Sequence, residues 1–403
     1  YVRDIFNKTK DSAITLHPHA KTFLLGSALA VGIANDSVRE SSRDALEKIR
    51  DDVSTVLHYK KKKDVPRPEA PKPVTVTVSQ PGIGEGDQSL EDVLQAAHDS
   101  WRKLPYPGLK GQMYSRPRGV EDWAICATDL RTGEYLVDFN CDRQQMVASA
   151  NKIPIMIAYF HQVKEGKLQD DQEKTLEKMI RESHNPSTNN ILALIGNGNS
   201  SRGALLANDI LKSYGFPQTA IEAIPGGGRT LGNKSTAGEL NTMLAWIYNP
   251  SLNPDEKKRF PYSQKMKRIL GLDSLPGHSN RLTDGEDNCI PTDPSYMEHP
   301  VGAYVTIFDK TGYLKGANVN SAVIEAHFKT DKGDLTVPYA LTLAVQDVQA
   351  KQDKVFGNGD LWGGIKSKQM RQDSQIIFWR LYKKYTEEDY ACGYHNGVHP
   401  HEF

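Results

Sequence analysis

Long apolar runs are missing from this sequence. The N-terminal stretch Thr22 to Ala34 is apolar over about 13 residues, short of the roughly 18–20 that a membrane-spanning helix needs. An excess of one charge is missing too, since 50 basic residues balance 50 acidic ones. This balance gives no support for a nucleic-acid or other polyanionic partner. The 403 residues, 38% hydrophobic and 25% charged, indicate a soluble globular chain with one large domain and an appendage, or two ordinary domains.

Cysteine is scarce, and histidine forms no recognisable metal site. The four cysteines are Cys126, Cys141, Cys289 and Cys392. They form no CxxC pair and have no metal-ligand spacing to histidine. Two disulfides and four free thiols fit these counts equally well, so cysteine usage does not define the compartment. His399 and His401 have no third ligand placed beside them, and we predict a solvated tail, with no metal and no cofactor.

The apolar stretch near the N-terminus has two interpretations. It follows Lys8, Lys10 and Lys21 and ends in small residues, Gly32 to Ala34. A basic region, a short apolar core and small exit residues are typical of a secretory signal. The same length also suits a buried or interfacial helix. The first interpretation predicts an exported protein that is periplasmic or extracellular, either free or associated with the membrane.

The rest of the first 88 residues differs in composition from the remainder of the chain. Residues 36–58 alternate acids and bases around an apolar stripe at helical spacing, which predicts a surface helix. Lys60 to Lys63 then leads into a proline-rich stretch that cannot hold a helix. We predict an extension, residues 1–88, ending in an extended linker, and a main domain, residues 89–403. Residues 1–64 are the candidates for contact with a membrane or partner protein, although a solvated linker explains the lysines as well.

The main domain reads as strands, then helices, then strands. Ser89, with Asp92 three residues on, predicts a helix start. Two short apolar runs, 123–130 and 135–139, flank a Thr-Gly turn and predict a hairpin. Helical periodicity comes next at 153–164, 171–182, 189–195 and 236–248, and strand-like runs return at 303–309, 321–328 and 335–345 before a closing helix at about 373–385. This order predicts an α+β fold, with an antiparallel sheet flanked by helices and an all-helical subdomain between its strands.

The first of three short motifs is Ser149-Ala150-Asn151-Lys152, at the start of the predicted helix 153–164. Positions i and i+3 share a helix face, so the lysine amine can lie beside the serine hydroxyl. A serine becomes a nucleophile when a neighbouring base removes its proton. A lysine serves as that base when burial or nearby cations lower its pKa.

The other two motifs lie at later junctions. Ser183-His184-Asn185 supplies a serine that can relay a proton and an amide that can bind a substrate amide; alone, it reads as a turn. Lys310-Thr311-Gly312 comes directly after a strand-like run. Lys310 can attract a carboxylate, Thr311 can hydrogen-bond it, and Gly312 lets a substrate approach the backbone; alone, this is an ordinary strand end.

Together, in this order, the motifs resemble the S-x-x-K, S-D-N and K-T-G set of class A β-lactamases and penicillin-binding proteins. The hairpin ending in Asp129-Leu130-Arg131-Thr132-Gly133-Glu134 is similar to the one that opens the family's sheet. Asn185 to Asn189 and Phe308 to Tyr313 also look like family segments. The resemblance covers about Ser89 to Asp353 and implies a β-lactamase/transpeptidase-like fold.

The resemblance also implies roles. Ser149 would form the acyl-enzyme, with an oxyanion hole made of its own backbone N–H and that of Ala317. Lys152 would accept the proton and Ser183 would relay it. Asn185 would contact a substrate amide, while Lys310 and Thr311 would clamp its carboxylate. The substrate would be a small β-lactam or a peptidoglycan-like amide.

Two departures bear on the reaction. His184 stands where the family usually has aspartate, and only 34 residues separate Ser149 from Ser183, which predicts an open cleft. The loop that should supply the deacylating glutamate, Tyr214–Asn233, lacks the Glu-Pro-x-x-Asn pattern, and Glu222 is its only acid. We predict Glu222 as the candidate deacylation base, against the alternative that it is a solvated loop acid.

Three functions are compatible with these residues. The first is a serine hydrolase that is acylated at Ser149 by a β-lactam or related amide and then hydrolysed. The second is a D-alanyl-D-alanine-type peptidase, or penicillin-binding protein, with slow deacylation. The third is a binding or structural subunit that kept the fold without turnover; the intact Ser149–Lys152 pair argues against it.

Overall fold

The structure is a computed structural model, in which the chain divides into two compact units, Tyr1–Val76 and Thr77–Phe403. It describes residues 89–103, 106–107, 113–114, 121–163, 169–222, 232–271, 282, 290–292, 294–298, 302–314, 316–347 and 360–388. The apolar stretch, the charged helix and the lysine- and proline-rich linker predicted for residues 1–88 lie outside the described residues. Among the residues it describes, no helix is long and apolar enough to cross a membrane.

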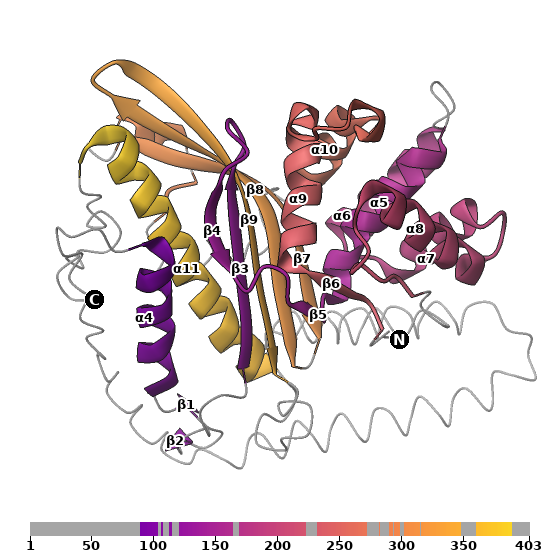
Figure 1. Ribbon diagram of the computed structural model, residues 1–403, viewed down its shortest axis with the longest axis horizontal. Helices are drawn as coiled ribbons and strands as arrows, with labels where there is room; N and C mark the ends of the chain where they lie inside the picture. The colour runs from indigo at the N-terminus through magenta and orange to yellow at the C-terminus, as the bar shows by residue number, and fades with distance from the viewer. Residues whose placement is uncertain are drawn as a thin grey trace, which may run out of the picture. The chain divides into compact units, whose positions relative to one another are not determined.

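A five-stranded antiparallel sheet, in the order β4-β3-β9-β8-β7, forms the centre of the fold (Figure 1). Its strands are β3 (Glu121–Asp129), β4 (Tyr135–Phe139), β7 (Ala303–Leu314), β8 (Ala317–Thr330) and β9 (Gly333–Asp347). Two small sheets pair β1 (Tyr106–Pro107) with β2 (Met113–Tyr114) and β5 (Gln144–Met146) with β6 (Lys234–Thr236). Early and late strands therefore share one antiparallel sheet, with the helices between them in sequence, as the order of the predicted elements indicated.

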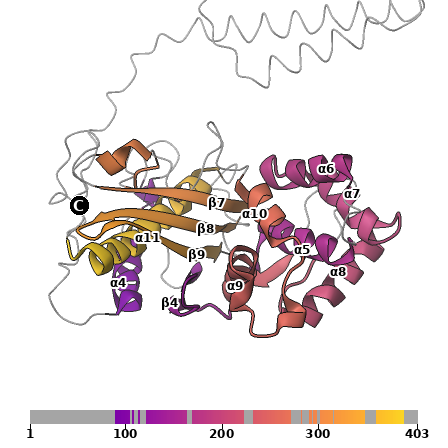
Figure 2. The ribbon, with the colours of Figure 1, turned by 90° about the horizontal axis from the view of Figure 1, so that it is seen from above.

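Helices cover both faces of this sheet. The helices and the 3-10 turns between them are α4 (Leu90–Lys103), η2 (Ala148–Asn151), α5 (Lys152–Gln162), α6 (Asp170–Arg181), α7 (Asn185–Ile195), α8 (Ser200–Tyr214), α9 (Ala237–Tyr248), η4 (Pro250–Leu252), η5 (Glu256–Lys258), α10 (Ser263–Gly271), η7 (Pro294–Glu298) and α11 (Asp360–Thr386). One apolar core joins the sheet to α4 and α11, and another joins it to α9 and the helical subdomain. In Figure 2, α5 to α8 gather at one end of the sheet strands. The predicted α+β architecture is therefore confirmed.

Two helices escaped the sequence analysis, and two elements are longer than predicted. α8 contains Gly203 in its first turns, which weakens a helical pattern. A Cβ on Gly203 would lie 1.7 Å from the backbone oxygen of Leu192, so this glycine is needed where α7 and α8 meet. The short helix α10 was also missed. α11 begins at Asp360 and not near 373, because Gly363 and Gly364 obscure its start, and β7 continues through the third motif.

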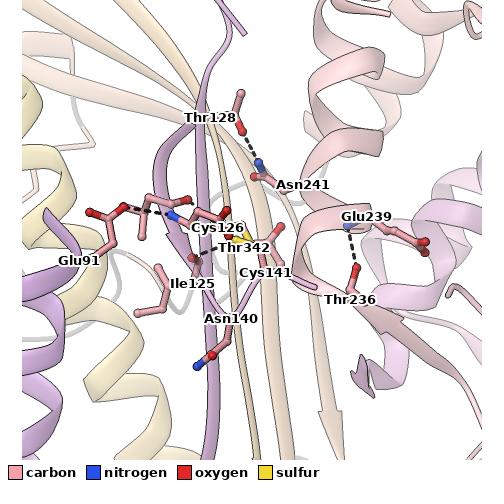
Figure 3. The surroundings of a disulfide bond; sticks show 12 residues. Glu91, Ile125, Cys126, Thr128, Asn140, Cys141, Thr236, Glu239, Asn241 and Thr342 are labelled. Atoms are coloured by element: carbon pink, nitrogen blue, oxygen red, sulfur yellow. Dashed lines mark hydrogen bonds between the residues drawn. A yellow bond between two sulfur atoms is a disulfide. The ribbon is translucent and has the colours of Figure 1, made fainter. Parts of the chain in front are cut away.

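A disulfide fastens the first hairpin to the segment that leads toward the helical subdomain. Cys126, on β3, bonds to Cys141, which lies just after β4, across a sequence separation of 15 residues (Figure 3). The backbone oxygen of Cys141 accepts a 2.8 Å hydrogen bond from the amide of Gly238, in the first turn of α9. The two buried sulfurs therefore hold together β3, the β4–β5 connection and α9. Cys289 and Cys392 lie outside the described residues.

Removing this disulfide should destabilise the domain without rearranging it. A loop of about 15 residues predicts a loss of roughly 3 kcal/mol in the free energy of unfolding, because the open chain regains conformational freedom. Denaturant unfolding of the Cys126→Ala/Cys141→Ala double variant measures this. Reductant should lower the stability of the wild-type protein and leave that of the double variant unchanged. Equal stability of the two proteins under oxidising conditions would contradict the expectation.

Candidate active site

Ser149 lies in a strained turn between a strand and a helix. The chain leaves β5, passes through η2 and continues directly as α5. Ala148, just before the serine, has φ +48°, in the left-handed region that disfavours residues with a Cβ. Strain of this kind persists where the surroundings fix the backbone, which often happens at functional sites. The turn therefore presents a half-buried Ser149 from a rigid frame.

Two backbone hydrogen bonds hold the turn. The amide of Ala150 donates to the oxygen of Val147 at 2.9 Å, and the amide of Val147 donates to the oxygen of Asn233 at 3.2 Å. Asn233 is buried and immediately precedes β6. The loop after α8 is thus connected through its backbone to the turn that holds Ser149, a contact that no side-chain motif in the sequence revealed.

Lys152 brings its amine directly to the serine. Its Nζ lies 2.8 Å from Ser149 Oγ and donates a 3.2 Å hydrogen bond to Asn185 Oδ1. Only 1% of the residue is exposed. This burial, followed by the charge of Lys310, lowers the pKa of Lys152 from 10.5 to about 7. A neutral amine can accept the serine proton while still donating to Asn185.

The middle motif lies between α6 and α7. Ser183 has φ +51° and is partly buried, and in the described part of the chain it makes no side-chain hydrogen bond. His184 is the N-cap of α7, and Asn185 is the first residue of that helix. Of the two polar residues of this motif, the structure brings Asn185 into contact with Lys152; Ser183 lies two positions before Asn185 along the chain.

The third motif lies within β7, the outermost strand of the sheet, and not after its end. Lys310 is 1% exposed, and its charge acts on Lys152. A Cβ on Gly312 would lie 2.3 Å from Val147 O, 2.8 Å from Ala150 N and 3.2 Å from Ser149 N. The glycine therefore packs against the backbone of the Ser149 turn, and this contact requires a residue without a side chain. Thr311 lies between the two and is partly exposed.

The hydrogen-bond pattern of β7 shows which of its amides face outward. The oxygen of Gly302 accepts from the amide of Lys329, on β8, at 2.7 Å, whereas the amide of Val305 donates to Pro291 on the other side at 2.8 Å. In an antiparallel strand, successive residues direct their backbone groups to opposite sides. Even-numbered residues of β7 therefore face β8, and odd-numbered ones face away from it.

This alternation argues against Ala317 as an oxyanion donor. Ala317 is fully buried at the start of β8 and pairs with Leu314 and Gln346. Leu314 is even-numbered, so the amide of Ala317 is directed into the ladder toward it. Tyr313 is odd-numbered, so its N–H points away from β8, directly after Gly312. The sequence assigned the oxyanion role to Ala317 because residue spacing alone does not reveal the strand register, and the register decides which amides face outward.

Glu222 is exposed and follows Ile221 at the end of a described segment. Its amide donates to Asn233 Oδ1 at 2.8 Å. Its carboxyl group packs over Gly232, where a Cβ would lie only 1.6–1.8 Å from the carboxyl atoms. The structure thus connects Glu222 to Val147 through Asn233 and leaves its carboxylate at the surface, whereas a general base for water needs contact with the reacting group.

The packing of Gly312 on the turn predicts that Gly312→Ala disables the site. The added methyl group would displace the Ser149 turn, and misplacement by about 1 Å costs on the order of 100-fold in rate. The rate of labelling by a fluorescent penicillin measures this, with thermal melting to show that the variant folds. Thr306→Ala on the same strand is the control and should label normally. A folded Gly312→Ala protein that labels at the wild-type rate would show that the turn tolerates a methyl group.

Comparison with known proteins gives matches of two kinds. Residues 117–190, which include Ser149, Lys152, Ser183 and Asn185, match the β-lactamase enzyme family. Among solved structures, PBP-A is 17% identical, with a TM-score of 0.49, over 74% of this chain and 98% of that one. A variant of PBP-A, solved as an acyl-enzyme complex with penicillin G, is 18% identical, with a TM-score of 0.46, over 66% and 92%.

A β-lactamase from Xanthomonas campestris is 13% identical, with a TM-score of 0.48, and the match covers 72% of this chain and 99% of that one. No curated protein sequence matches the chain. The resemblance drawn from the three motifs is thus confirmed for the segment that carries the first two of them. Over residues 117–190 the sequence is therefore similar to the β-lactamase enzyme family.

Proposed function

We propose that this protein is a serine hydrolase of the penicillin-recognising type that is acylated at Ser149 by a β-lactam or a related amide. One observation carries the proposal: the amine of a fully buried lysine, Lys152, lies 2.8 Å from the Ser149 hydroxyl. A buried lysine that served only the fold would need a charged partner or many hydrogen bonds. Lys152 has instead only a serine hydroxyl and an amide oxygen as its hydrogen-bond partners in the described part of the chain, while its burial and the nearby charge of Lys310 favour the neutral, basic amine.

The acylation step uses these contacts. Neutral Lys152 takes the Ser149 proton as Oγ attacks the carbonyl carbon, and negative charge develops on the carbonyl oxygen. Two backbone amides support that charge, those of Ser149 and Tyr313. The carbon–nitrogen bond then breaks, and the leaving nitrogen takes the proton from Lys152, directly or through Ser183. The product is an ester on Ser149 with the amine freed.

The surrounding polar groups orient the substrate. Lys310 is buried, and its positive charge acts on Lys152; because Lys152 is neutral in the reactive state, the charge of Lys310 makes the site favour a substrate that carries a carboxylate. Thr311, on the same strand, adds a hydroxyl donor, and Asn185 can donate its amide N–H to a substrate carbonyl while its oxygen holds Lys152. These roles match a β-lactam or a peptide with a terminal carboxylate.

Release of the acyl group is the slower step in our proposal. Because the carboxyl group of Glu222 is exposed and packs over Gly232, we assign the activation of water to Lys152 and not to Glu222. The protein then resembles a penicillin-binding peptidase in its kinetics more than a fast β-lactamase. Replacing Glu222 by Gln should leave turnover unchanged.

The compartment proposed for this activity is extracytoplasmic. The Cys126–Cys141 bond is buried in the domain, and disulfides persist mainly in oxidising compartments such as the periplasm or the cell exterior. This agrees with the secretory interpretation of residues 22–34.

Labelling by a fluorescent penicillin tests the proposed function. The wild-type protein should form a stable adduct that mass spectrometry locates on the peptide containing Ser149, and Ser149→Ala should abolish it. Ser213→Ala is the matched control, because this exposed serine bonds only to the backbone oxygen of Ile210. Absence of labelling in folded wild-type protein would support the binding-subunit alternative. Rapid consumption of a chromogenic β-lactam would show that deacylation is fast.

The lowered pKa of Lys152 predicts how labelling depends on pH. The amine is protonated and inactive below its pKa of about 7 and neutral and active above it. The second-order labelling rate should therefore rise with pH, with a midpoint near 7, and level off by about pH 8. A stopped-flow or quench series from about pH 5.5 to 9 gives the profile. A rate that falls with pH, or a midpoint near 10, would rule out Lys152 as the base.

A further inference from the structure

His184 replaces the usual aspartate of the middle motif, and the structure shows what its ring does. Its Nδ1 accepts a hydrogen bond from the amide of Ser187 at 3.3 Å and lies 2.8 Å from the Ser187 hydroxyl. The ring thereby caps α7, although histidine is not among the residues preferred for this position. Ser187 is 5% exposed, so its amide has little access to water as an alternative acceptor.

The cap is part of a turn that needs support. Ser183, before it, is held at φ +51°, which a serine adopts only when neighbouring contacts impose it. The backbone of His184 donates to Lys178 O, on α6, at 3.3 Å and accepts from the amide and the hydroxyl of Thr188, on α7, both at 3.1 Å. The ring and the backbone of one residue thus fix where α7 begins.

Two hydrogen bonds connect the first turn of α7 to the hydroxyl of Ser149. Asn185, the residue after His184, accepts from Lys152 Nζ at 3.2 Å, and that Nζ lies 2.8 Å from Ser149 Oγ. A shift in the first turn of α7 would therefore move the amide that orients the catalytic amine. α7 contains no charged side chain, so no carboxylate of that helix could cap its first turn in place of the imidazole.

We infer that His184 is a positioning residue for the acylation site: its neutral ring, with the proton on Nε2, holds Asn185 against Lys152 by capping α7. Only an unprotonated Nδ1 has the lone pair that accepts the Ser187 amide, so the site depends on one tautomer of this histidine. The inference rests on the proposed function, since it names how that site is held. It assigns His184 no contact with the substrate.

Two variants of His184 separate positioning from mere folding. His184→Ala removes the cap, and His184→Asn restores an acceptor that is favoured at helix starts. Labelling at Ser149 should slow by about tenfold or more in His184→Ala and stay within about threefold of wild type in His184→Asn. His161→Ala is the matched control, because it removes an imidazole bonded to Tyr214, outside the Lys152–Asn185 contacts; its labelling should be unchanged. Normal labelling of His184→Ala, or an Asn variant as slow as the Ala variant, would overturn the inference.

A measurement without a substrate keeps the inference distinct from the proposed function. In protein with ¹⁵N-labelled histidine, the ring of His184 should show an unprotonated Nδ1 and a protonated Nε2, because Nδ1 accepts the Ser187 amide. In protein with ¹³C-labelled lysine, the titration midpoint of Lys152 should rise in His184→Ala, because loosening the turn admits water to a buried amine, and stay near wild type in His184→Asn. These results would support the positioning role of His184 even if penicillin never labels Ser149. A proton on Nδ1 of the wild-type ring would overturn the inference, whether or not His184→Ala folds.

Discussion

The contact between Lys152 Nζ and Ser149 Oγ depends on keeping a lysine amine out of water. Its pKa falls from 10.5 in the unfolded chain to about 7 in the fold. Between these values the unfolded chain binds a proton that the folded one lacks, so stability rises with pH across this interval and is lowest below it. Each pKa unit corresponds to about 1.4 kcal/mol. The buried amine therefore costs several kcal/mol at neutral pH, and the rest of the fold offsets that cost.

The frame around α5 supplies the compensating stability. The helix is buried along most of its length, from Ile153 to Phe160, and the disulfide and α9 hold the chain that leads into it. Gly312 brings the outermost strand against the same turn. Ala148 and Ser183 are both in the left-handed region; Ala148 directly precedes Ser149, and Ser183 directly precedes His184, which caps α7. The elements that support these two strained backbone positions are the same ones that hold Ser149 and Lys152.

The sequence predicted the contact between Ser149 and Lys152 better than it predicted the backbone geometry around them. Ser149, in η2, and Lys152, at the start of α5, are three residues apart in one continuous helical turn, so local spacing was enough to bring them together. The order of strands and helices likewise results from local periodicity. Ala317 was misjudged because the outward amide of β7 depends on register, which is a property of the pairing with β8 and not of spacing. The cap made by His184 was missed because histidine is an unusual N-cap, and α8 was missed because Gly203 weakens its pattern while serving the contact with α7.

The state of the lysine is the central claim, and direct titration tests it. In wild-type protein carrying ¹³C-labelled lysine, the Cε resonance of Lys152, assigned through Lys152→Met, should titrate with a midpoint near 7 while exposed lysines titrate near 10. A midpoint for Lys152 close to that of the exposed lysines would mean that its amine is a solvated or paired cation at neutral pH. That result would contradict its role as the base that activates Ser149.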